Sequence, residues 1–134
     1  MLKFVKVNLN PKNRKTGDCS TRALANILNI SYEQALKEQC EAVIKTCYGI
    51  TCKETIDYVM KKYGWEKQKQ PKKWDNTKYK VCEIDEILST NEMKEGSLVL
   101  IANHWTIVRD YNIEDIWDCG RKSVGNYWIK KGAN

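Results

Sequence analysis

The sequence predicts an α+β fold, with helices in the first half of the chain and strands in the second. Capping residues followed by apolar residues at helical spacing recur up to about residue 90. Short apolar runs separated by turns fill the stretch from about 97 to 130. Helices followed by strands are typical of the α+β class. A length of 134 residues fits one domain. We therefore expect a single domain, 1–134, whose helical part (about 18–90) packs against an antiparallel sheet (about 97–130).

The first two helices are predicted from their starts and their apolar spacing. Asp18 can cap a helix over 19–28, whose small and apolar residues share one face. Ser31 and Gln34 form a capping box that opens a second helix. Its expected buried stripe consists of Tyr32, Ala35, Leu36, Cys40, Val43, Ile44 and Cys47. This spacing is that of one helix face.

A third helix and four of the cysteines are assigned to packing. Thr51 and Glu54 form another capping box, and Gly64 ends the helix that follows. Four of the six cysteines fall on or beside apolar stripes: Cys40, Cys47, Cys52 and Cys82. We expect these four to be small buried hydrophobic residues, and Cys119, at the end of a strand, to be incidental. A metal site from Cys47 and Cys52 is the less favoured alternative, because their spacing matches no standard zinc pattern.

The strands predict an antiparallel meander. Their expected ranges are 97–102, 105–110, 114–119 and 124–130. A three-residue loop at 110–112 would place His104 opposite Asp118 on one side of the sheet. A two-residue turn would shift the register by one and put Asp118 on the other face. The sequence leaves both open.

Composition excludes several classes of protein. The longest apolar runs are too short to span a membrane, and the first residues lack the apolar core of a secretory signal. We therefore expect a cytoplasmic protein with reduced thiols, no membrane partner, no metal and no cofactor. The net charge of +6 includes a Lys-rich segment, 66–80, in which lysines alternate with Trp74 and Tyr79. A solvated loop is the favoured interpretation of this segment, and nucleic-acid binding the alternative.

Cys19 and His104 are the residues with the clearest chemical potential. Cys19 lies in the first turn of a predicted helix, where free N–H groups and the helix dipole lower a thiol pKa. His104 is the only histidine, and an acid at Asp118 would orient its ring. The alternatives are a helix that happens to begin with cysteine and a structural histidine.

The order of these residues resembles that of the papain-like cysteine peptidases, near the bacteriocin-processing enzymes and small bacterial and phage papain-like proteins. The matching motifs are Gly17-Asp-Cys-Ser-Thr-Arg-Ala23, Tyr32, Gly64-Trp65, the late His104, Trp117-Asp118 and Tyr127-Trp128. Together they cover most of the chain, from about residue 13 to residue 128. The Lys-rich segment has no counterpart in this pattern.

The resemblance implies a role for each site residue. Cys19 would be the nucleophile, His104 the general acid and base, and Asp118 the orienting acid. The oxyanion hole would combine the backbone N–H of Cys19 with the side chain of Asn13, where the family usually has Gln. The residues expected to line the substrate site are Gly17, Asp18 and Trp105.

The function implied is that of a cysteine hydrolase acting on a peptide, isopeptide or amide bond, with a protein or peptide as substrate. One alternative is an inactive papain-like binding protein, for example a phage product that engages a host protein. The other is a basic accessory protein that binds nucleic acid. The sequence indicates no oligomeric state.

Overall fold

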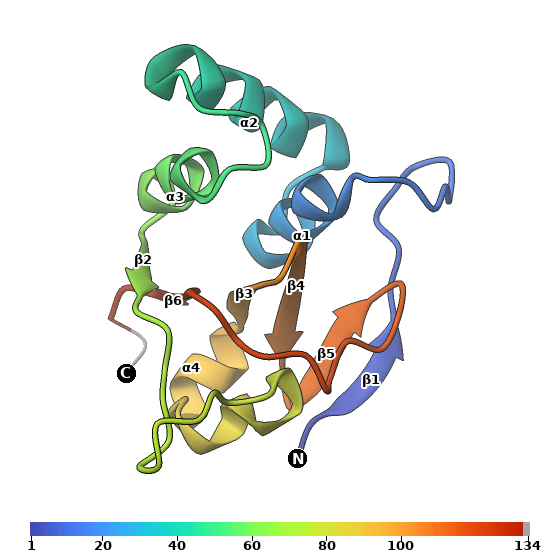
Figure 1. Cartoon of the computed structure of the whole chain (residues 1–134). Coiled ribbons are helices and arrows are strands. Elements are labelled where there is room, and N and C mark those ends of the chain that lie inside the picture. The colour runs from blue at the N-terminus through green and yellow to red at the C-terminus, as the bar shows by residue number, and fades with distance from the viewer. Residues whose placement is uncertain (133–134) are drawn as a thin grey trace.

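The computed structural model describes residues 1–132, so the last two residues of the predicted domain, 133 and 134, lie outside the described part. Figure 1 shows three helices gathered on one side of a sheet and shorter helical segments on the other. The predicted α+β class is confirmed. Within residues 1–132, every helix is too short or too polar to cross a bilayer.

The three longer helices are α1 (Cys19–Leu28), α2 (Tyr32–Thr46) and α3 (Lys53–Lys62). The first two begin where the sequence predicts, and the Ser31 side chain accepts a hydrogen bond from the Gln34 amide at 3.0 Å. The capping box expected at Thr51 is wrong: the N-cap of α3 is Cys52, without a side-chain cap. Gly64, with φ of +86°, follows the end of α3 and adopts a conformation that other residues rarely adopt.

Helix α2 is rotated relative to the prediction. Its buried residues are Ala35, Glu38, Gln39 and Ala42. Gln39 is fully buried because its amide accepts from the Thr21 hydroxyl and donates to that of Ser20. Of the expected apolar stripe, Ala35 is buried, but Ile44 is 77% exposed and both Cys40 and Cys47 are exposed. The prediction that Cys40 and Cys47 pack in the core is therefore wrong. The core-facing side of α2 carries Gln39, whose side chain is hydrogen-bonded to Ser20 and Thr21.

The sheet has six strands in the order β1-β5-β4-β3-β6-β2. They are β1 (Lys3–Lys6), β2 (Trp65–Gln68), β3 (Ser97–Ile101), β4 (His104–Arg109), β5 (Asn112–Asp115) and β6 (Tyr127–Lys130). The β3–β4 and β4–β5 pairs are antiparallel, as expected. The predicted meander is wrong in its last strand, because β6 pairs with β3 and not with β5. The two strands at the edges, β1 and β2, were not predicted, and β1 runs parallel to β5.

Two expectations about the sheet are thus corrected: it is mixed, and it is not confined to the second half of the chain. Strand β2 lies within the predicted helical part, and β1 precedes it. Each has only four residues, mostly exposed, so neither shows the apolar alternation of a half-buried strand. Short, exposed edge strands such as these are defined by their hydrogen bonds to a neighbouring strand, and their own sequences carry no clear strand pattern.

Both faces of the sheet are covered, because neighbouring residues of β3 enter different cores. Leu98 packs with α1, α2 and α3, whereas Val99 packs under the 3-10 helix η1 (Val81–Glu86) and helix α4 (Thr90–Glu95). Trp128 is fully buried in the core beneath α1, α2 and α3, and the centroid of its ring lies 5.3 Å from that of Trp105. Helix α1 is in this way held against β4, the strand that begins with His104.

The Lys-rich segment is exposed over most of its length, as the favoured interpretation predicts. Its first residues form β2, and an antiparallel bridge pairs Lys72 with Lys78. Trp74, at the tip, is 98% exposed. The segment projects from the molecule below the sheet in the view of Figure 1, away from α1.

Candidate active site

Cys19 is the first residue of α1 and is half-buried. Its backbone N–H lies in the first helical turn, where amides have no acceptor within the helix. Asp18 occupies the N-cap position, but its side chain does not cap the helix. The Asp18 carboxylate instead pairs with Arg22 and accepts hydrogen bonds from Asn10 at 2.9 Å and Tyr32 at 2.7 Å. Asp18, predicted to line the substrate site, is therefore engaged in fixing the loop that leads to Cys19.

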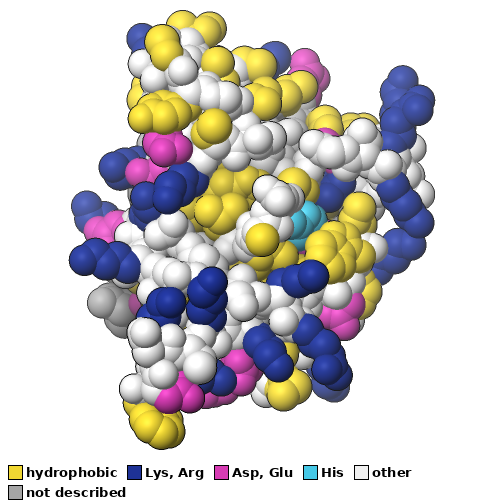
Figure 2. Space-filling model, in the orientation of Figure 1, with side chains coloured by type: hydrophobic (Ala, Val, Ile, Leu, Met, Phe, Trp, Pro, Cys, Tyr) yellow, Lys and Arg dark blue, Asp and Glu magenta, His cyan; other side chains and the backbone are white. Residues whose placement is uncertain are grey.

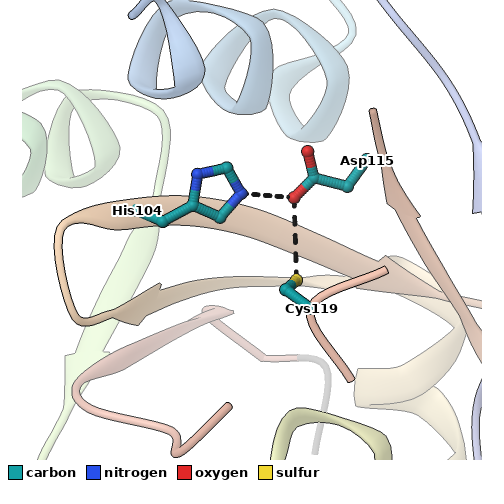
Figure 3. A group of neighbouring side chains, drawn as sticks. All are labelled: His104, Asp115 and Cys119. Carbon is teal, nitrogen blue, oxygen red and sulfur yellow. Dashed lines mark hydrogen bonds and ion pairs between the residues drawn. The ribbon is translucent and has the colours of Figure 1, made fainter. Parts of the chain in front are cut away.

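His104 begins β4 and is 9% exposed. Its Nε2 lies 2.6 Å from Oδ2 of Asp115, the contact drawn in Figure 3. The other ring nitrogen, Nδ1, points away from Asp115, on the side of the ring where α1 lies (Figure 3). The ring of Trp117 packs against the imidazole at 4.9 Å between centroids. His104 is thus fixed on one side by a carboxylate and covered by an aromatic ring.

The structure brings Cys19 and His104 together, as the sequence predicts. Burial would raise the pKa of the Cys19 thiol, but interactions with His104 and with the Trp105 backbone lower it below its ordinary value. Burial would lower the pKa of His104, but interactions with Asp115, Cys119 and Cys19 raise it to about 11. Both shifts favour a thiolate next to an imidazolium.

Asp115 is the acid that orients His104. Its Oδ1 accepts the backbone N–H of Ile116 at 2.7 Å, and its Oδ2 accepts from His104 and from the thiol of Cys119 at 3.7 Å (Figure 3). Burial would raise the pKa of Asp115, but interactions with His104, with the Thr106 side chain and with the Ile116 backbone lower it. The carboxylate is therefore ionised and has its acceptor sites satisfied.

Asp118 does not face His104, so the expectation that it orients the ring is wrong. The loop has two residues, which is the second of the two lengths that the sequence leaves open. Asp110 and Tyr111, with φ of 50° and 64°, form a two-residue turn. Val108 then pairs with Ile113, and continuing this register puts Asp115 beside His104 on one face of the sheet. Asp118 is exposed and accepts the backbone N–H of Gly120 at 3.0 Å.

Asn13 also lies apart from Cys19. It is exposed, has a φ of 53°, and its Oδ1 accepts a hydrogen bond from Asn8 at 3.3 Å. The expected contribution of Asn13 to an oxyanion hole has no support in this geometry. The reason is local: the loop turns at Asn13, where the Asn13 amide donates to the carbonyl of Asn10, and directs the side chain toward Asn8.

A pocket of 380 Å³ opens beside the thiol and the imidazole. Its lining residues are Gly17, Cys19, Thr51, Leu100, Asn103, His104 and Trp105. Two of the residues expected to line the substrate site, Gly17 and Trp105, are among them. Trp105 is 4% exposed, and its Nε1 donates to the Thr51 carbonyl at 3.3 Å, so it forms a fixed wall of the pocket.

Sequence reasoning missed three neighbours of His104: Asp115, Trp117 and Cys119. The first two follow from the register, because a two-residue turn places position 117 opposite His104 and position 115 next to it. Cys119, treated as incidental, is 1% exposed and donates to Asp115. Its burial depends on the fold of residues 116–124, for which the sequence offers no periodic signal.

Within residues 1–132, one group of side chains has a donor set suited to a metal ion: His104, Asp115 and Cys119, whose ligand atoms lie within 4.8 Å of one another. Nitrogen, oxygen and sulfur ligands suit zinc. The hydrogen bonds among the three account for their closeness, and Nε2 and Oδ2 are nearer than two ligands of one tetrahedral ion would be, about 3.3 Å or more. The arrangement is that of a proton-sharing site.

Comparison with known proteins gave no match to a protein family, to a curated protein or to a solved structure.

Proposed function

We propose that the protein is a thiol-dependent hydrolase, in which Cys19 attacks the carbonyl carbon of a peptide, isopeptide or amide bond. The observation that carries this proposal is the continuous series of interactions from Cys19 through His104 to Asp115, at the edge of an open pocket. A nucleophile, a base and a group that orients the base are the three parts that such catalysis needs.

The proposed reaction begins from the Cys19 thiolate and the protonated His104. The Cys19 thiolate adds to the carbonyl carbon, and the protonated imidazole donates its proton to the departing amine as the C–N bond breaks. This leaves a thioester on Cys19 and a neutral His104. His104 then takes a proton from water as the water oxygen attacks the thioester. The C–S bond breaks, which releases the carboxylic acid and restores the Cys19 thiolate beside a protonated His104. Asp115 holds Nε2 throughout, so that Nδ1 is the nitrogen available to Cys19 and to substrate.

The negatively charged oxygen that forms when a nucleophile adds to the carbonyl carbon needs hydrogen-bond donors to stabilise it. The backbone N–H of Cys19, at the start of α1, is one such donor and is reinforced by the helix dipole. Because Asn13 faces Asn8, a second donor from that side chain is missing. Loss of one donor costs about 10²–10³ in rate in hydrolases where it has been measured. We therefore expect slow turnover of unactivated amides and faster turnover of thioesters or activated esters.

A papain-like fold is part of the same proposal. The nucleophile begins an early helix packed on a sheet, the histidine begins a strand of that sheet, and the acid comes one strand later. This order, together with the motifs of the sequence, supports the assignment.

Selective alkylation tests the proposal. Iodoacetamide at about pH 6 reacts with thiolates, and the ordinary thiol pKa of 8–9 leaves few of them. We expect Cys19 to be labelled at least tenfold faster than Cys40 and Cys47, both exposed and remote from any histidine. Peptide mapping of one sample compares all three. The His104→Ala variant should abolish the difference; equal, slow labelling of the three in the wild type would contradict the proposal.

The orientation of Asn13 favours a second candidate, a papain-like binding protein without catalytic activity. The two candidates predict different reactions with activated thioesters. If Cys19 is selectively labelled by iodoacetamide but activated thioesters yield neither an acyl-enzyme detectable by mass spectrometry nor product, the binding protein is supported. Accumulation of the acyl-enzyme supports the hydrolase.

A further inference from the structure

The surface around the candidate active site carries mostly positive charge. Figure 2 shows Lys and Arg side chains on several sides of His104 and few carboxylates near it. Five exposed cations flank site residues along the chain, and we call them the basic rim: Arg14, Lys15, Lys53, Arg121 and Lys122. From the geometry and charge of this rim we propose that the site takes an acidic peptide. This inference rests on the proposed function, because it names the substrate class of the same site.

The rim residues are close in the sequence to residues of the site, on three segments. Arg14 and Lys15 precede Gly17 in the loop to Cys19, and Lys53 follows Thr51 at the start of α3. Arg121 and Lys122 follow the buried Cys119, so the third segment lies on the Asp115 side of His104.

The rim cations have few local counter-charges. Within residues 1–132 none of the five forms a salt bridge. The carboxylates closest to the thiol are already neutralised, Asp18 by Arg22 and Asp115 by His104. Two carboxylates remain beside the rim residues in the sequence: Asp118, which is exposed, and Glu54, which is half-buried and follows Lys53. The rim therefore leaves an excess of positive charge around the pocket, which raises the local concentration of an anionic partner.

The pocket itself favours a peptide over a nucleic acid. It is lined by Leu100 and by the edge of Trp105, and it carries no charged side chain apart from the Cys19–His104 pair. Single-stranded bases bind by stacking on exposed aromatic faces. Here Trp105 is buried, and Trp117, which is 39% exposed, is packed against the ring of His104. An extended peptide with acidic residues flanking a small or apolar residue would fill the pocket and meet the rim.

Binding can be measured without catalysis in the Cys19→Ser variant of the full chain. Fluorescence anisotropy compares labelled peptides rich in Glu, Gln or Lys around a central Ala. We expect the Glu peptide to bind at least tenfold more tightly than the Lys peptide, and the preference to shrink as the Debye length falls from about 30 Å at 0.01 M salt to about 3 Å at 1 M. Equal affinity for the three peptides would overturn the inference.

Charge reversal locates the binding surface. Two double substitutions are made in the Cys19→Ser variant: Arg14→Glu/Lys15→Glu and Arg121→Glu/Lys122→Glu. Each should weaken binding of the Glu peptide about tenfold. Lys37→Glu/Lys45→Glu on the exposed side of α2 makes the same change in net charge and is the matched control. An equal loss in the control would show that net charge alone acts, and would contradict a site-specific rim.

Two further readouts separate the possible failures. If a single-stranded oligonucleotide displaces the Glu peptide at a lower concentration than unlabelled peptide does, the acidic-peptide assignment is overturned in favour of nucleic acid. In the wild-type chain, the Glu peptide should protect Cys19 from iodoacetamide, which places it at the pocket; binding without protection would overturn the assignment to this site. Selective labelling of Cys19 with no peptide preference would refute the inference while leaving the proposed hydrolase intact.

Discussion

His104 is the residue whose surroundings define the candidate site. Asp115 fixes Nε2, and Trp117 packs against the ring. Cys19 interacts with His104 from the start of α1, the helix on the side that Nδ1 faces in Figure 3. The two ionisable neighbours act on the charge of the same ring: the carboxylate holds the proton on Nε2 and stabilises the imidazolium, and the thiolate pairs with its positive charge. The chemistry of Cys19 should therefore be sensitive to residues that do not touch it.

Exchanging the two candidate acids tests this dependence. We expect Asp115→Asn to slow alkylation of Cys19 at about pH 6 by tenfold or more, because the imidazolium loses its counter-charge and its orientation. Asp118→Asn is the matched control, since its side chain bonds only to the Gly120 amide, and should change the rate by less than about twofold. If Asp118→Asn slowed alkylation more than Asp115→Asn did, Asp118 would be the orienting acid. Peptide mapping of the labelled protein measures both.

Cys119 acts through Asp115 and is a positioning residue. Cys119→Ala removes one donor from Oδ2 and leaves a small void, so we expect Cys19 alkylation at about pH 6 to slow by about threefold. Cys119→Ser keeps a donor of similar size and should recover most of the rate. The two variants could instead slow Cys19 alkylation equally while their free energies of unfolding stay unchanged. That result would show that the hydrogen bond from Cys119 to Asp115 has no effect on the Cys19–His104 pair.

At the scale of the elements, one turn decides which acid meets the histidine. Strands β4 and β5 are joined by two residues, both with positive φ, a conformation that Asn-Gly adopts far more readily than Asp-Tyr. The turn holds its register because both strands are anchored elsewhere: the Tyr111 carbonyl accepts from the Lys3 amide, and the Asp110 amide donates to the Met93 carbonyl. Tertiary contacts here override weak local turn signals.

Replacing the turn with its preferred residues should stabilise the protein. Asp110→Asn/Tyr111→Gly keeps the backbone bonds and removes the strain of positive φ, so we expect the free energy of unfolding to rise by about 1 kcal/mol. Urea denaturation measures this. The rate of Cys19 alkylation should stay the same, because the register of His104 and Asp115 is unchanged. A fall in stability together with loss of labelling would show that the register depends on the native side chains.

At the scale of the whole molecule, His104 and Asp115 are buried between layers, so their interaction contributes to stability as well as to the chemistry of the site. Helix α1 and the sheet meet at Cys19 and His104, and Asp115 lies 5% exposed beneath them. A buried ion pair of this kind ties stability to pH through both partners.

The sign of this dependence follows from the two shifts. The pKa of His104 is raised from 6.5 to about 11, so its contribution is complete below pH 6.5 and is lost as the pH rises toward 11. The pKa of Asp115 is lowered from 3.8, so its contribution is present above pH 3.8 and is lost as the pH falls below that value. The two describe one interaction and are not added.

We therefore expect wild type and Asp115→Asn to differ most in free energy of unfolding between pH 3.8 and 6.5. The difference there should be about 3 kcal/mol, because the substitution leaves a buried imidazole without its counter-charge. It should shrink on both sides of this window. Urea titrations across the pH range measure it, and a difference that does not vary with pH would contradict an ion pair in the folded state.

The pairing of Cys19 with the only histidine was expected from an order of motifs that resembles the papain-like peptidases. Local sequence was sufficient for the α+β class and for the starts of α1 and α2. These features rest on capping and periodicity, which act within a few residues. The packing of the folded chain was needed to show that Asp115 orients His104, that Cys119 is buried beside it, and that α2 buries Gln39 in place of Cys40. Each of these depends on the register or rotation of a whole element against its neighbours, where a shift of one residue exchanges the buried and exposed faces.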